Sequence, residues 1–261
     1  MGNPVIGSHF LVEDSEARHY HSAGLAIALD PESDFEEAIQ NFEVADAILS
    51  TADPTIDSRV QLARVRRDEG FTMVRRGLVL KDQELMVIAR SALVSSAELT
   101  LEAAGYTGEL AYDPAGVPSA HGTRKHAHRE IFAEHGATLG LLGRLTTAEA
   151  VLLDSTTSGD SEEAKQARLN DQAYYGAAHD FLRVGNNGYY LVSNAMCGAR
   201  QEVLNGQRMG SNMWLLRAGR GLVWTVAHDR RNMHQALLTA GSRTRHLTSH
   251  DAARDSVFTK P

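Results

Sequence analysis

The chain has 261 residues, 43% hydrophobic and 23% charged, which is enough to bury a sizeable core in one large domain or two small ones. Its six prolines and few alternating β-branched runs argue against an all-β fold, and its abundant Ala, Leu, Arg, Glu and Gln predict an all-α protein. The single cysteine, Cys197, excludes an intramolecular disulfide and a cysteine-based zinc site, and no stretch approaches the ~20 apolar residues that span a bilayer.

The net charge of −7 is unevenly distributed along the chain. Residues 1–105 carry 18 acidic and 9 basic side chains, whereas residues 183–261 carry 4 acidic and 11 basic ones. Such asymmetry is typical of an anion-binding end or of head-to-tail contacts between copies, so a homo-oligomer is one hypothesis. The negative total argues against general nucleic-acid binding.

Residues 1–13 are predicted to be an N-terminal extension without a secretory leader. They lack the basic region followed by an apolar run that a signal peptide needs. Because no membrane-spanning stretch occurs either, the sequence predicts a cytoplasmic protein without a membrane partner.

A first helix is expected over about 14–30, and a second, amphipathic helix is expected over 34–54. Ser33 or Asp34 is the predicted N-cap of the second helix, and Pro54 forbids its continuation. Its apolar face consists of small residues around one large ring, which predicts neighbouring helices at very close distance. The residues of this face are Ala38, Phe42, Ala45 and Leu49.

A glycine recurs inside five predicted helices along the chain. A glycine in the middle of a helix costs about 1 kcal/mol relative to alanine, so it usually has a packing reason. The segment 104–122 is rich in Gly and Pro and is predicted to be an inserted loop. The recurring glycines are Gly24, Gly70, Gly136, Gly176 and Gly219.

These features resemble the tetratricopeptide-repeat (TPR) family, whose members stack pairs of helices. In that pattern a first helix carries one glycine and a second glycine seven residues later at the turn. The next helix carries small, aromatic and small residues at spacings of four and three. The matching residues are Gly70 with Gly77, Gly136 with Gly143 followed by Ala148, and Ala38, Phe42 and Ala45 in a second helix.

The resemblance implies an α-solenoid of about five antiparallel helix pairs over residues 14–241. The first-helix tryptophan of the family is absent, the period is longer, and the last two units, 161–207 and 209–241, keep little beyond the glycine. An irregular helical bundle is the alternative. Residues 242–261 are predicted to form a capping helix and tail, with inward-facing Leu247, Ala252 or Ala253, and Val257 or Phe258, and with Ser249 as a cap.

In the family, ligand side chains stand on the first helix of each pair and line a concave groove. The resemblance therefore implies a groove whose arginines gather in the first two units. Guanidinium groups bind carboxylates or phosphates bidentately, so the expected ligand is an acidic peptide segment or a free C-terminus. The alternative is that these arginines are solvated or paired with acidic neighbours such as Asp68. The groove residues are Arg18, His21, Arg64, Arg67, Phe71, Arg75, Asn170, Asp180, Arg220 and Trp224.

Sequence motifs of catalysis are absent: no Walker A loop, strand-linked G-x-G-x-x-G, G-x-S-x-G or HExxH occurs, which favours a non-enzyme without a cofactor. The histidines of residues 121–135 stand beside arginines and a lysine that would repel a cation. They are therefore interpreted as exposed side chains rather than a metal site. Cys197 has small neighbours at helical spacing, which predicts a packed small side chain rather than a nucleophile.

The leading functional hypothesis is a non-enzymatic protein- or peptide-binding module, acting as an adaptor, scaffold or regulator. One alternative is a regulatory or nucleic-acid-associated role for the basic C-terminal third, with Trp214 and Trp224 available for stacking. Another alternative is an enzyme with a pocket under the loop 104–122.

Overall fold

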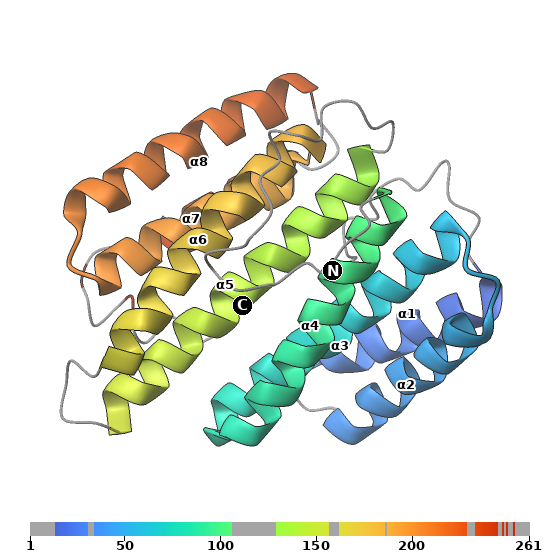
Figure 1. The fold of residues 1–261 in the computed structure, drawn as a ribbon. Coiled ribbons are helices and arrows are strands. Elements are labelled where there is room, and N and C mark those ends of the chain that lie inside the picture. Colours follow the sequence, from blue (N-terminus) through green and yellow to red (C-terminus); the bar gives the residue numbers. More distant parts are fainter. Residues whose placement is uncertain are drawn as a thin grey trace. The chain divides into compact units, whose positions relative to one another are not determined.

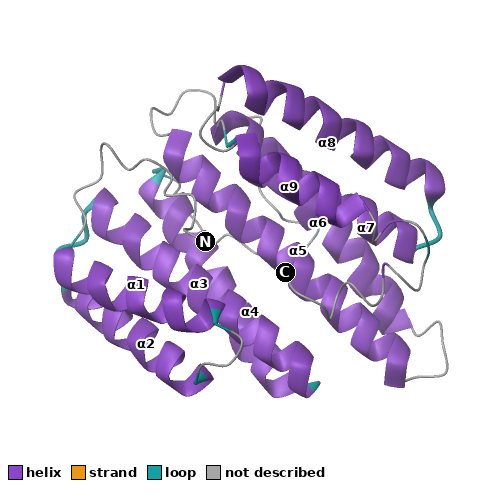
Figure 2. Cartoon of the chain, turned by 180° about the vertical axis from the view of Figure 1, so that it is seen from behind, coloured by secondary structure: helices purple, strands orange, loops and turns teal. Residues whose placement is uncertain are grey.

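The structure is a computed structural model that describes residues 14–30, 34–105, 129–156, 162–185, 187–228 and 233–244, together with Leu247, Ser249 and Ala253. Within this part of the chain the regular structure is helical and no strand occurs, which confirms the all-α prediction there (Figures 1 and 2). The chain packs as two compact units, Met1–Glu109 and Leu110–Pro261. Their boundary falls within the predicted inserted loop, and residues 106–122 of that loop, like residues 1–13, lie outside the described residues.

The described part of the first unit contains four helices, each packed on the next along the chain. Short polar side chains cap their N-termini: Asp34, rather than Ser33, accepts the backbone N–H of Glu36, and Thr55 accepts that of Ser58. The two antiparallel pairs α1–α2 and α3–α4 are joined by contacts between α2 and α3 (Figure 1). The helices are α1 (Ser15–Leu29), α2 (Phe35–Thr51), α3 (Ile56–Leu80) and α4 (Gln83–Ala103).

The apolar face of α2 is buried as the sequence predicts. Ala38, Phe42 and Ala45 are fully buried, and Leu49 is only 4% exposed. The alanines allow the backbones of neighbouring helices to approach closely, while the Phe42 ring fills the space between α1 and α2.

One close contact between helices recurs in three pairs, α1–α2, α3–α4 and α5–α6. In each pair a glycine of the first helix faces a large side chain of the second, and also faces the carbonyl oxygen of an alanine four residues before that side chain. A Cβ atom on the glycine would lie 2.8–3.2 Å from these atoms. The three sets are Gly24 with Phe42 and Ala38, Gly70 with Leu93 and Ala89, and Gly136 with Leu182 and Ala178.

The second unit contains five described helices. Helix α5 pairs with α6, α7 pairs with α8, and α9 packs on both α7 and α8 (Figure 2). Its core includes Tyr175 of α6, Cys197 of α7 and Trp214 of α8, surrounded by small side chains. The helices are α5 (Arg129–Thr156), α6 (Glu162–Gly185), α7 (Gly188–Leu204), α8 (Arg208–His228) and α9 (Met233–Thr244).

Helix α5 corrects one sequence-based interpretation. Gly143 and Ala148, which the repeat pattern assigns to a turn and to a second helix, both lie inside one continuous helix. The reason is that Gly143 serves close packing rather than a turn, because a Cβ atom there would lie 2.9 Å from the Tyr175 ring of α6. The second helix of this pair is therefore α6.

The predicted assignment of helices to pairs is consequently wrong by one helix from this point onward. Gly176 and Gly219 lie on α6 and α8, which are second helices of their pairs rather than first helices. Neither glycine has a neighbouring atom within 4 Å of the place where a Cβ would stand. The packing reason expected for these two glycines is therefore not found.

The end of the chain is described at few positions. Of the predicted inward-facing residues, Leu247 packs against the core of the second unit and Ala253 is fully buried, with its N–H donated to the carbonyl oxygen of Ser249. The rest of the predicted capping segment after Thr244 lies outside the described residues. Among the helices that are described, none combines the length and the apolar character that a bilayer crossing requires.

Candidate binding surface

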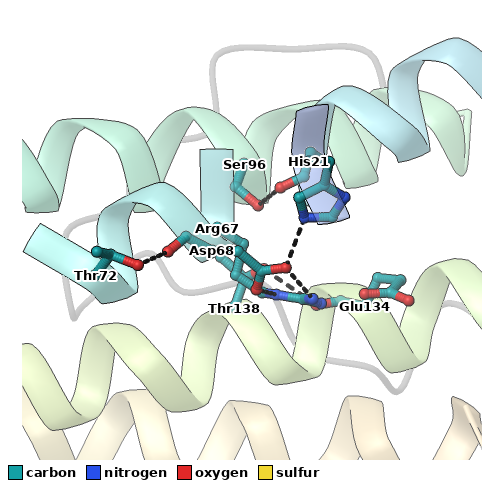
Figure 3. Close-up of polar contacts among 8 residues, drawn as sticks. His21, Arg67, Asp68, Thr72, Ser96, Glu134 and Thr138 are labelled. Carbon is teal, nitrogen blue, oxygen red and sulfur yellow. Dashed lines mark hydrogen bonds and ion pairs between the residues drawn. The ribbon is translucent and has the colours of Figure 1, made fainter. Parts of the chain in front are cut away.

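The predicted groove residues of the first unit partly gather around one buried carboxylate. His21 of α1 lies with its Nε2 atom 2.9 Å from Oδ2 of Asp68 on α3, and Arg67 donates Nε–H to Oδ1 of the same residue at 2.9 Å (Figure 3). Arg67 and Asp68 are each only 8% exposed. The carboxylate thus occupies the guanidinium group that the sequence assigns to a ligand, as the ion-paired alternative predicts.

The pKa of Asp68 lies well below its usual range. Burial alone would raise it, but the positive charge of Arg67 and the hydrogen bond from His21 outweigh this effect. Asp68 is therefore a carboxylate at neutral pH, and it links α1 to α3 through charge-assisted hydrogen bonds.

The other predicted residues of the first unit are more dispersed. Arg75 is half-buried and donates Nη1–H to the carbonyl oxygen of Ala28 at 2.7 Å, so its guanidinium group ties α3 to α1. Arg64 and Phe71 are half-buried on α3, and Arg18 is exposed on α1. The residues therefore belong to two packed helices, but part of their binding capacity is used within the protein.

A neighbouring polar cluster, absent from the predicted set, joins α2, α3 and α4. Arg66 donates Nε–H to Asp46 at 2.6 Å and Nη1–H to Ser95 at 2.6 Å. Burial, and next the negative charges of Asp46 and Glu43, raise the pKa of Glu69 to about 7, although Arg66 opposes this shift. The ionised form of Glu69 is accordingly unfavourable in the folded protein.

Replacing Glu69 with Gln is expected to stabilise the protein at alkaline pH. The folded-state pKa of Glu69 exceeds its ordinary value of 4.5, so ionisation opposes folding fully above about pH 7 and not at all below about pH 4.5. The gain in unfolding free energy should be about 1 kcal/mol at pH 8, because solvent screening reduces the effect. Urea unfolding of the wild type and of Glu69→Gln at pH 8 and pH 4.5 measures this gain. An equal difference in stability at the two pH values would contradict the raised pKa of Glu69.

The predicted residues of the second unit lie on α6 and α8. Asn170 and Asp180 are half-buried on α6, and Asn170 accepts a hydrogen bond from Gln166 one turn earlier. Arg220 is exposed and Trp224 half-buried on α8. Because α6 and α8 are second helices of their pairs, these four residues do not occupy the first-helix positions from which the resemblance derives them.

Helix α8 has apolar side chains on two faces. Its inner face is buried and contacts α7, where a Cβ atom on Gly198 would meet the Trp214 ring at 2.6 Å. Its outer face carries a second apolar row at spacings of four and three residues, interrupted by Arg220. The large members of this row are Met209, Met213, Leu216 and Val223, which are 76%, 53%, 60% and 73% exposed.

This spacing is that of a helix seam. Positions four and three residues apart form one stripe along a helix, which is the pattern that receives a second helix. A helix that is apolar on opposite faces is normally covered on both. The outer row, hereafter the α8 stripe, is therefore a candidate docking surface, and contiguous exposed apolar side chains of this kind mark interaction sites.

The charge of α8 is of one sign. Its sequence, Arg208–His228, contains three arginines and neither Asp nor Glu. The guanidinium group of Arg217 lies 4.4 Å from the centre of the Trp214 ring, a cation–π contact, whereas Arg220 stands within the α8 stripe. The surface therefore combines apolar area with positive charge.

The histidines and the basic C-terminal third also differ from the expectations. His135, interpreted as exposed, is fully buried and packs edge-on against Phe181 at 4.5 Å between ring centres, while His121, His126 and His128 lie outside the described residues. In the part of the chain that the structure describes, no group of three His, Cys, Asp or Glu side chains is placed to hold a metal ion. Within the basic C-terminal third, Arg243 contacts the buried Ser193 and Cys197 of α7 and is only half-exposed to solvent.

A comparison of the chain with models of known protein families, with curated proteins and with solved structures found no match. The candidate surface therefore rests on the geometry of this chain alone. The amino-acid sequence does contain a signal for it, namely the four-and-three spacing of Met209, Met213, Leu216, Arg220 and Val223.

Proposed function

We propose that this protein is a non-enzymatic binding module, a helical-repeat protein of the TPR type, that docks an acidic amphipathic helix of a protein partner on the α8 stripe. The observation that carries the proposal is the exposed apolar row Met209, Met213, Leu216 and Val223 on a helix without acidic residues. Recognition would follow the helix-in-groove mode, in which apolar side chains one turn apart anchor the partner.

The chemistry of the partner follows from the charges. The arginines of α8 would lie beside the apolar row in the complex, so acidic side chains flanking the partner's own apolar row would complement them and exclude basic helices. The composition of the α8 stripe also favours a protein partner over nucleic acid, because the centre of the stripe is apolar and α8 carries few arginines. The recurring glycine contact within three helix pairs supports the repeat interpretation.

The test uses fluorescence anisotropy with a labelled synthetic helix that carries Leu at the a and d heptad positions and Glu at the e and g positions. We expect it to bind at least about tenfold more tightly than the same peptide with Lys in place of Glu. The variant Met213→Glu/Val223→Glu should lose binding because it places charges on the α8 stripe. Both side chains are exposed, so the variant should keep its fold, which circular dichroism checks.

The matched control is Val44→Glu, which adds a charge at a 40% exposed valine on α2 and should leave binding unchanged. Equal binding of the acidic peptide by the wild type and by the α8 variant would refute the docking surface. A molecular mass that rises with concentration in the wild type and not in the α8 variant would show instead that a second copy covers the stripe.

A further inference from the structure

Three arginines from three helices converge on one turn of α7. Arg144 comes from α5, Arg200 from α7 itself and Arg243 from α9, and each retains some exposed surface. Ser193 and Cys197, one helical turn apart on α7, form the floor beneath them and are each 3% exposed. The three arginine side chains are thus half-buried, whereas the floor is buried.

The contacts are short and share acceptors. Arg144 donates Nη2–H to Ser193 Oγ at 2.9 Å, and Arg243 donates Nη1–H to the same oxygen at 3.1 Å. Arg243 also donates to the carbonyl oxygen of Ser193 at 3.2 Å and lies 3.0 Å from Cys197 Sγ. Two positive groups therefore meet at one hydroxyl oxygen, a placement that requires negative charge nearby.

The protein itself provides little of that charge. Among the residues that the structure describes, neither Arg144 nor Arg243 forms an ion pair with a carboxylate; their contacts are Ser193 and Cys197. Burial would raise the pKa of the Cys197 thiol, but the charges of Arg144, Arg243 and Arg200 lower it to about 6. Among the described residues, Tyr175 and Tyr189 also face Arg144, and Tyr189 faces Arg243. Burial raises the pKa of Tyr175, and the negative charge of the buried Asp171 acts on Tyr175 in the same direction.

We propose that Arg144 and Arg243, with the positive charge of Arg200 nearby, form a binding site for a tetrahedral oxyanion, a phosphate group present either as the free ion or as a monoester. Guanidinium groups bind phosphate oxygens through paired N–H donors, and Ser193 keeps an O–H that is able to donate to the same ligand. Without ligand, the Cys197 thiolate is the internal counter-ion. An incoming anion competes with this thiolate for the arginines, so binding returns the thiol to its neutral, protonated form.

The first experiment measures binding of inorganic phosphate and of phenyl phosphate by isothermal titration calorimetry, at constant ionic strength. Arg243→Gln and Arg144→Gln should each weaken binding by about tenfold or more, because each removes charge-assisted hydrogen bonds. The control Arg208→Gln removes an exposed arginine of α8 and should leave the affinity unchanged. Binding of phosphate itself identifies the free ion as a ligand, and binding of phenyl phosphate alone identifies a monoester.

The second experiment does not depend on removing an arginine. Sulfate keeps its charge between pH 5 and pH 8, so its affinity for the wild type should fall as pH rises through the pKa of Cys197, while Cys197→Ser should show no such fall. In the same titrations, sulfate should raise the pKa of the thiol, followed by thiolate ultraviolet absorbance. The serine variant is nearly isosteric and is expected to fold.

No binding of any of the three anions to the wild type, or binding that Arg208→Gln weakens as much as Arg243→Gln, would overturn the site. Binding with the same pH dependence in wild type and Cys197→Ser would overturn the role of the thiolate. These outcomes are independent of the peptide-binding test, because the α8 stripe contributes none of the residues of the arginine site.

Discussion

Replacing Gly136 with Val is expected to lower the free energy of unfolding by about 3 kcal/mol, since added atoms in a closed helix crossing force the backbone apart. A Cβ atom at this position of α5 would lie 2.8 Å from Cγ of Leu182, 3.0 Å from its backbone nitrogen and 3.1 Å from the carbonyl oxygen of Ala178. Two of these three atoms belong to the α6 backbone, so a change of side-chain rotamer does not relieve the clash. Thermal unfolding should show a decrease in Tm of about 6–12 °C.

The matched control is Gly176→Val on α6. No atom lies within 4 Å of the Cβ position there, and valine has a higher helix propensity than glycine. This variant should therefore have an unchanged or slightly higher Tm. Similar losses in the two variants would show that the helix crossing at Gly136 is not the cause.

Asp68→Asn is expected to cost about 3 kcal/mol of unfolding free energy, because it removes the charge that faces Arg67 in a buried position. The amide keeps the shape of the side chain, but its NH₂ group is only a donor. It cannot accept the hydrogen bonds from Arg67 and His21 that the carboxylate oxygens accept. Chemical denaturation at pH 7 measures the loss. Asp53→Asn, at an exposed position between α2 and α3, is the control and should change stability by less than about 0.5 kcal/mol.

The loss also has a defined pH dependence. Since the pKa of Asp68 is depressed in the folded state, its contribution is fully present above the ordinary pKa of 3.8 and disappears as the pH falls through the folded-state value. The stability difference between wild type and Asp68→Asn should therefore be constant from pH 5 to pH 8 and shrink in strong acid. A difference that grows on acidification would argue against a buried, ionised Asp68.

The helices of the first unit are predictable from their own local sequences. In α2 the apolar period, the Asp34 cap and the stop at Pro54 all act within the helix itself, so they are readable without knowledge of the fold. Helix α5 is different, because the local sequence around Gly143 predicts a turn. The Tyr175 ring that requires a glycine there comes from another helix, and this contact is invisible in the local sequence.

The candidate sites were predictable only in part. The sequence indicates that His21 and Arg67 lie on neighbouring helices, but adjacent residues on a helix do not normally face each other, so the pairing of Arg67 with Asp68 had no periodic signal. Arg144 and Arg243 are about 50 residues from Ser193 in opposite directions along the chain. No motif spacing connects residues so far apart; only the packing of α5 and α9 on α7 brings them together.

The recurring glycine contact closes hairpins of different sizes. Gly70 and Leu93 are 23 residues apart, whereas Gly136 and Leu182 are 46 apart. Each doubling of a closed segment adds only about 0.6 kcal/mol of chain entropy, so the longer hairpin is scarcely harder to close than the shorter one. The extra residues of the longer hairpin lie within α5 and α6 themselves, so chain closure sets little limit on the lengths of these helices, whereas a methyl group added at their crossing clashes directly with the α6 backbone.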